Sequence, residues 1–160
     1  MTQEEIKDIF KRLAEPMPVK WRVGPKIGSR LSVLAYLDAR MVQQRLDDVV
    51  GPENWANVYD SETGTATISI FINGEWVSKT DVGTESKVDK EKGKASDSFK
   101  RAAVLWGVGR FIYTDPKYSG KMLPLDQSGK YPTTADGKKI LYNGEQITLY
   151  MNGLSTSMGQ

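Results

Sequence analysis

The chain has 160 residues, a formal net charge of +2 and 26% charged residues, values that suit a folded domain long enough to bury a core. It contains no Cys and no His, which excludes disulfides, thiol nucleophiles, histidine general bases and nearly every zinc site. Residues 1–78 hold 9 Lys/Arg against 11 Asp/Glu, and residues 79–160 hold 13 against 9, so the halves carry −2 and +4. This asymmetry permits a basic groove in the second half.

A helix is predicted from about Gln3 to Ala14, because the prolines of Glu15-Pro-Met-Pro18 disfavour helical geometry just before them. The segment Met1–Lys11 is charged and amphipathic and lacks the apolar centre of a signal peptide. No stretch approaches the roughly 18 apolar residues of a membrane span. The expected location is therefore a reducing cytoplasm, in keeping with the lack of cysteine.

The next segment predicts one strand, a loop and a second helix. Val19–Val23 alternates with period two, and Gly24-Pro25 with Gly28-Ser29 indicates a loop. Val33–Val50 has an apolar face at helical spacing and ends at Gly51-Pro52, which predicts a helix.

Three strands are predicted in the middle of the chain, at Trp55–Tyr59, Thr65–Ile72 and Glu75–Val82. Asn73-Gly74 tolerates positive φ and suits a tight hairpin turn between the last two. The alternation within Thr65–Ile72 leaves one apolar sheet face for a helix to cover. The expected fold class is α+β, with an antiparallel β-meander packed against a central helix in a β-β-β-α core.

The region after the meander is polar and rich in turns. Thr84–Gly93 is typical of a solvated loop or first helical turns. Lys139–Tyr142, Asn143-Gly144 and Glu145–Tyr150 predict a C-terminal hairpin. Residues 153–160 carry no packing signal and are expected to form a disordered tail after a domain of residues 1–152.

The central helix is predicted within Lys94–Tyr113. Phe99, Ala102, Ala103 and Trp106 recur at i, i+3, i+4 and i+7, which places them on one buried stripe. At the edge of the stripe lie Lys100 and Arg101, where two cations can meet a phosphate backbone. An alternative remains open, because Asp97 can pair with both cations on the helix surface at about 0.2–0.5 kcal/mol per pair. Trp106 and Tyr113 could stack on bases, but aromatic residues at such positions are more often core.

Two blocks of sequence resemble a known family. Asp81-Val-Gly83, then Lys94-Ala95, then Ser98-Phe-Lys-Arg-Ala-Ala-Val-Leu-Trp-Gly107 is similar to the core motif of the Rad fifty-two family of single-strand annealing proteins, and closest to its phage Sak-type branch. The block from Tyr36 to Trp55 resembles the family's helix that ends in a Gly and a short turn before the Trp of the first strand. The resemblance covers about residues 19–118.

The resemblance implies a set of DNA-binding residues. Lys100 and Arg101 match the paired basic residues that hold the sugar-phosphate backbone, and Arg22 matches an arginine that faces the same groove. A further groove lysine falls within the polar linker, where the register is ambiguous. Val104 stands where the eukaryotic branch has another Arg, which implies a less basic groove. The complete set of candidates is Lys100, Arg101, Arg22, Lys87, Lys90, Lys92 and Lys94.

The resemblance also implies the activity: ATP-independent binding of single-stranded DNA and annealing of complementary strands in phage-type homologous recombination and repair, inside a bacterial host cell. The implied assembly is a homo-oligomeric ring or filament, with a host or phage single-strand-binding protein as a further partner and no membrane contact. No cofactor and no catalytic step are expected.

Enzyme motifs are incomplete in the sequence. Gly93-Lys94-Ala95-Ser96 is similar to the end of a phosphate-binding loop, but Val88 occupies the position of the required glycine. Asp47-Asp48 point about 100° apart on a helix and have no partner cluster. Two alternatives remain: a single-strand-coating accessory protein without annealing activity and, more remotely, a small recombination nuclease.

Overall fold

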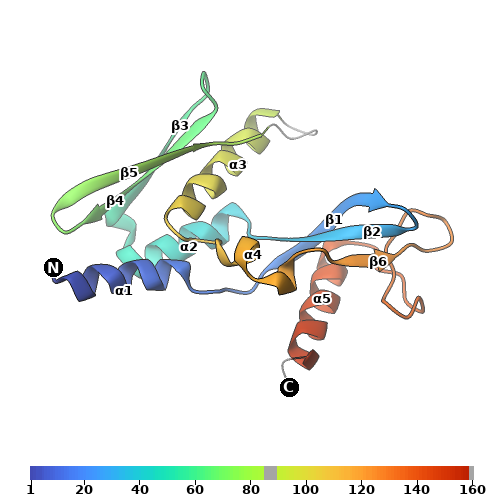
Figure 1. Cartoon of the computed structure of the whole chain (residues 1–160). Coiled ribbons are helices and arrows are strands. Elements are labelled where there is room, and N and C mark those ends of the chain that lie inside the picture. The colour runs from blue at the N-terminus through green and yellow to red at the C-terminus, as the bar shows by residue number, and fades with distance from the viewer. Residues whose placement is uncertain (85–89, 159–160) are drawn as a thin grey trace. The chain divides into compact units, whose positions relative to one another are not determined.

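The computed structural model describes residues 1–84 and 90–158 (Figure 1). The chain forms two compact units, one of Met1–Met17 with Leu37–Phe111 and one of Pro18–Tyr36 with residues 112–160. Each unit contains a three-stranded antiparallel sheet, and we call them the motif unit and the hairpin unit. The expected domain of residues 1–152 covers the motif unit and part of the hairpin unit, which extends to residue 160. Among the described helices, none is both long and apolar enough to cross a membrane.

The meander of the motif unit is confirmed. Its strands are β3 (Trp55–Asp60), β4 (Thr65–Ile72) and β5 (Glu75–Val82), in the order β3-β4-β5. Asn73 and Gly74 have φ angles of 52° and 83°, which the tight turn between β4 and β5 requires at both central positions. Ile72 pairs directly with Glu75 across this turn.

The helix α3 (Lys90–Leu105) lies along one face of this sheet, as Figure 1 shows. On the covered face, Ala66, Ile68 and Ile70 of β4 are fully buried. The predicted stripe of α3 meets them, since Phe99 and Ala102 are also buried. The α+β class and the β-β-β-α core are therefore confirmed.

The helices α1 (Gln3–Ala14) and α2 (Ala39–Val50) belong to the same unit, and the short 3-10 helix η1 (Pro52–Asn54) leads from α2 into β3. The predicted bounds of α1 are confirmed; Thr2 caps it by accepting the backbone N–H of Glu5 at 3.1 Å. At the other end of α1, Arg45 of α2 donates to the carbonyls of Arg12 and Glu15 at 3.0 and 2.7 Å. Arg45 thereby satisfies carbonyls that the last turn of a helix leaves without partners.

The prediction of a loop followed by a helix from Val33 is wrong. The structure has a hairpin of β1 (Lys20–Ile27) and β2 (Arg30–Tyr36), and α2 begins only at Ala39. Asp38 caps α2 by accepting the N–H of Met41 at 2.9 Å. The apolar run before Asp38 fits either a strand or a helix face, and pairing with β1 makes it a strand.

The predicted C-terminal hairpin is also wrong. After α4 (Phe111–Thr114), η2 (Pro116–Tyr118) and β6 (Met122–Pro124), the chain ends in α5 (Gly144–Met158), which packs on β1. Asn143 accepts the N–H of Gln146 at 2.9 Å, so the Asn-Gly pair begins a helix and does not form a turn. Helix α5 includes residues 153–158, which the sequence assigned to a tail, and residues 159–160 lie outside the described part.

Candidate nucleic-acid interface

The first motif block fixes α3 against the sheet through Ser98, which is fully buried. Its hydroxyl accepts the N–H of Gly83 at 2.9 Å and lies within donating distance of the carbonyls of Lys94 and Gly64, at 2.6 and 2.8 Å. A side chain at Gly83 would come within 2.5 Å of the Ser98 backbone nitrogen. The Gly83 and Ser98 of the motif therefore serve close packing, which holds α3 rigidly in place.

The aromatic residues of the motif differ in their surroundings. Trp106 is 1% exposed, donates to the carbonyl of Ile68 at 3.1 Å and stacks on Phe10 with ring centroids 5.9 Å apart. Lys79 lies over the Trp106 ring at 4.8 Å. Trp106 is core, as expected, and has no free face for a base. Tyr113 is 74% exposed and does not belong to the apolar stripe.

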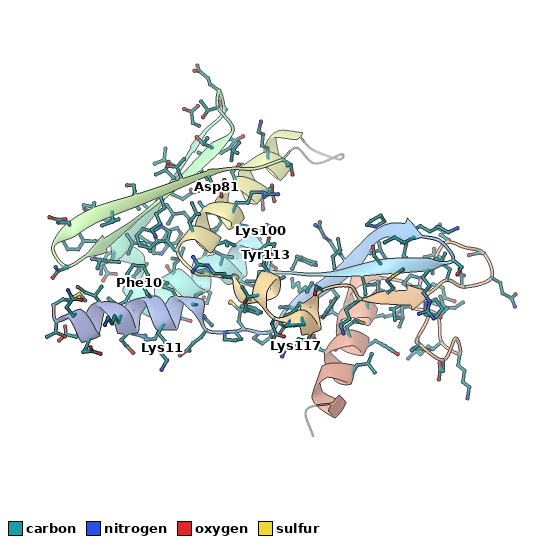
Figure 2. All side chains as sticks on the ribbon, in the orientation of Figure 1. Phe10, Lys11, Asp81, Lys100, Tyr113 and Lys117 are labelled. Carbon is teal, nitrogen blue, oxygen red and sulfur yellow. The ribbon has the colours of Figure 1, made fainter. Side chains whose placement is uncertain are left out.

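Lys100 lies at the edge of the exposed face of α3 and Arg101 lies within that face, because consecutive helical residues point about 100° apart. Lys100, labelled in Figure 2, is half-buried, and Arg101 is exposed. Arg101 donates through Nε to Asp97 at 2.9 Å, one helical turn earlier. The surface pair that the sequence left as an alternative is thus present, and 46% of the Arg101 side chain is still exposed.

Asp97 is held in its charged form. Burial raises the pKa of this carboxyl, but the hydrogen bond from Arg101 and the backbone N–H of Thr84 outweigh that effect and lower its pKa below the ordinary value. The Thr84 N–H lies 2.7 Å from the carboxylate. Asp97 therefore joins the start of the linker to α3 and orients the guanidinium of Arg101.

The linker lysines are placed only in part. Lys94 is half-buried on α3, and its side chain lies over Gly64, at the turn between β3 and β4. Lys90 and Lys92 belong to the first turn of α3 by their backbone. Lys87 lies outside the described residues.

Arg22 belongs to the hairpin unit, on β1, whereas Lys100 and Arg101 belong to the motif unit. Its guanidinium lies over the ring of Tyr36 on β2, 5.5 Å from the ring centroid. Lys20 precedes it on the same face of the strand, because side chains alternate with period two. Both cations are exposed. The strand therefore presents two cations beside an aromatic ring.

The hairpin unit is built from two separate segments of the chain, residues 18–36 and 112–160, and together they concentrate positive charge. This unit holds 9 Lys/Arg against 4 Asp/Glu, a net +5, while the motif unit holds 13 against 16, a net −3. The strands β1 and β2 contribute four cations and no acid, namely Lys20, Arg22, Lys26 and Arg30. Counting charge by sequence halves missed this surplus, because residues 18–36 join residues 112–160 only in the fold.

The other open surface that sequence reasoning missed is uncharged. Phe71 and Trp76 lie side by side on the sheet face away from α3, with ring centroids 5.4 Å apart. The period-two alternation of β4 and β5 was the signal for it. Within the described ranges, no three carboxylates gather into a group that could hold a metal ion.

Comparisons with known proteins give two relatives. No family model matches the chain. It is 38% identical over 122 residues to the single-stranded DNA-binding protein DdrA of Deinococcus deserti, an alignment covering 71% of this chain and 60% of the relative. The protein of the same name from Deinococcus radiodurans is 34% identical over 122 residues, covering 71% of this chain and 58% of the relative. The chain thus spans about 60% of the length of the curated relatives it matches.

Proposed function

We propose that this chain binds single-stranded DNA and anneals complementary strands without ATP. The observation that carries the binding proposal is the similarity over 122 residues to two proteins named for binding single-stranded DNA. The annealing activity and the role in phage-type recombination rest on the resemblance of the two motif blocks to the Rad fifty-two family. The relatives' names mention neither.

Two basic surfaces support the binding proposal. Lys100 and Arg101 project from a helix that the buried Ser98 contacts hold rigid, so little backbone entropy is lost when they meet phosphates. Lys20 and Arg22 project from a strand of the unit that carries the net positive charge. Phosphate contacts at either surface neutralise the backbone and are independent of base sequence.

The proposed mechanism is physical and includes no catalytic step. Cations hold the backbone of one strand and leave its base edges accessible to a second strand. A complementary strand then tests its register, and duplex stacking of about 1.4 kcal/mol per step drives the exchange. Because one chain covers few nucleotides, we propose a ring or filament of copies that joins their grooves. A host or phage single-strand-binding protein is the further partner we propose, in the cytoplasm of a bacterial cell.

The second candidate function is strand coating without annealing, which the relatives' names fit equally well. Two complementary oligonucleotides, one carrying a fluorophore and the other a quencher, separate the candidates when mixed with protein, without nucleotide and with EDTA. A faster loss of fluorescence than in buffer supports annealing. Tight binding with an unchanged rate selects coating, and shortening of the strand after magnesium is added selects a nuclease. An absence of binding at low salt overturns both binding proposals.

A further inference from the structure

The face of the β3–β4–β5 sheet opposite α3 carries ten side chains without a charge. Strand pairing places there Ala56, Val58, Thr65, Thr67, Ser69, Phe71, Trp76, Ser78, Thr80 and Val82. Asp60 ends β3 on the same face, and its carboxylate turns back to accept the N–H groups of Glu62 and Thr63 in the turn. We call these ten residues the neutral face.

The neutral face exposes large apolar side chains. Val58 is 66% exposed, Trp76 54%, Val82 50% and Phe71 40%. In Figure 1, α3 lies on the other side of the same sheet, which is why that side is buried. Exposed apolar groups gathered on one surface of a soluble protein mark an interaction site more often than scattered ones do.

The polar side chains of the neutral face already bond to one another across the strands. The hydroxyls of Thr67 and Thr80 are 2.7 Å apart, and those of Ser69 and Ser78 are also 2.7 Å apart. Burying a hydroxyl costs free energy chiefly when it leaves the group without a hydrogen bond. This face can therefore be covered by an apolar surface at little polar cost.

The chemistry of the neutral face favours a protein partner over DNA. Interfaces with DNA are strongly positive, but this face has no cation and belongs to the unit of net charge −3. The centres of protein interfaces are instead poor in charge and rich in Trp and Phe. An identical neutral face is a matching partner, because two such faces meet without burying an unpaired charge.

We infer that the neutral face is a contact surface between two copies of this chain, packed sheet on sheet about a two-fold axis. Two strands of eight residues and one of six, at about 3.4 Å per residue and about 4.8 Å apart, give a flat area of roughly 360 Å² per copy. Stable interfaces bury about 800 Å² per partner, so the face supplies about half of that. The contact is accordingly concentration-dependent, and its largest apolar side chains, Phe71 and Trp76, lie at the end of the face beside the Asn73-Gly74 turn.

The inference is tested without DNA, so its failure leaves the proposals of single-strand binding and annealing standing. The mass of the whole chain is measured by sedimentation over a range of concentrations for wild type, for Trp76→Glu and for Leu149→Glu. Leu149 of α5 is 69% exposed and lies in the other unit, so it controls for the added charge. We expect Trp76→Glu to weaken association at least tenfold, because it removes the largest apolar side chain of the face and puts a charge in its place, and Leu149→Glu to match wild type.

A charge-swap experiment distinguishes face-to-face contact from any other arrangement. Trp76→Glu and Trp76→Lys should each associate weakly alone, and an equal mixture should associate more strongly than either, because the two contacting faces then carry opposite charges in place of like charges. Val58→Glu on β3 repeats the test if a Trp76 variant fails to fold. A wild type that stays monomeric, or a Trp76→Glu variant that keeps the wild-type mass while folded, overturns the inference.

Discussion

Replacing Lys100 and Arg101 together by Ala distinguishes phosphate contact from surface pairing. The Arg101–Asp97 pair is exposed and spans one helical turn, so its loss costs about 0.3–0.5 kcal/mol. Alanine is the best helix former and offsets part of that cost. Lys100 is half-buried, so its replacement adds a cost of similar size. For a chain of this size 1 kcal/mol corresponds to roughly 2–4 °C, so we expect the melting temperature to fall by no more than about 4 °C. The fold should therefore survive the double substitution.

The effect on DNA binding should be much larger if the two residues contact phosphates. Each lost contact with a single strand reduces the slope of log K against log salt by about 0.7, so two lost contacts reduce it by about 1.4. Fluorescence anisotropy with a labelled oligonucleotide at several salt concentrations measures this slope. The loss of affinity should be similar for every base sequence, because phosphates carry no base identity.

The matched control removes two exposed lysines from α1 of the same unit, as Lys7→Ala with Lys11→Ala. This variant lowers the net charge equally, so any general electrostatic effect appears in both. We expect the Lys100/Arg101 variant to bind more weakly than this control and with a smaller slope. Equal affinity and equal slope for the two variants would refute the assignment of Lys100 and Arg101 to the DNA site.

Three further predictions concern stability. The lowered pKa of Asp97 means that its charged form stabilises the fold above the ordinary value of 3.8, and that this contribution disappears as the pH falls through the still lower folded value. In the Asp97→Asn variant, the free energy of unfolding measured by urea titration should therefore fall less between about pH 5 and about pH 2.5 than it does in wild type. Gly83→Ala forces a Cβ against the backbone nitrogen of Ser98 and should cost about 1–3 kcal/mol, seen as a fall of several degrees in melting temperature. Lys79→Met removes the cation over the Trp106 ring and should lower the free energy of unfolding by about 0.5–2 kcal/mol in urea titrations.

Each stability prediction has a control of the same chemistry. Asp8→Asn makes the same substitution at an exposed position of α1 and serves as the control for the loss of one carboxylate. Gly153→Ala adds a Cβ in α5 where nothing lies within 4 Å, so it should be neutral or stabilising. Lys11→Met removes an exposed lysine and should change stability little. A variant that behaves like its control contradicts the contact on which its prediction rests.

The sequence by itself determined the β-β-β-α core, because the signals for it are local. The alternation in Thr65–Ile72 specifies which face of the strand is buried, and Asn73-Gly74 supplies the two positive φ angles of the turn. The spacing of Phe99, Ala102 and Trp106 specifies the buried side of α3. Where side chains repeat with one clear period, the backbone geometry follows from that period.

Tertiary contacts decided the elements whose local signals were ambiguous. The run from Leu31 to Leu37 satisfies both a helical and a strand period, and pairing with β1 and β6 makes it a strand as far as Tyr36. Asn143 suits a hairpin turn or a helix cap, and α5 forms in the fold, where Thr148 and Asn152 bond to Trp21.

The candidate site depends on the fold for the same reason. The residue types and helix spacing marked Lys100 and Arg101, but only the structure shows that Asp97 orients one of them. Arg22 was matched to a groove by resemblance, whereas the fold places it over Tyr36 in the unit that carries +5. That charge becomes visible only when residues 18–36 and 112–160 come together, since electrostatic potential depends on distance in space and not along the chain.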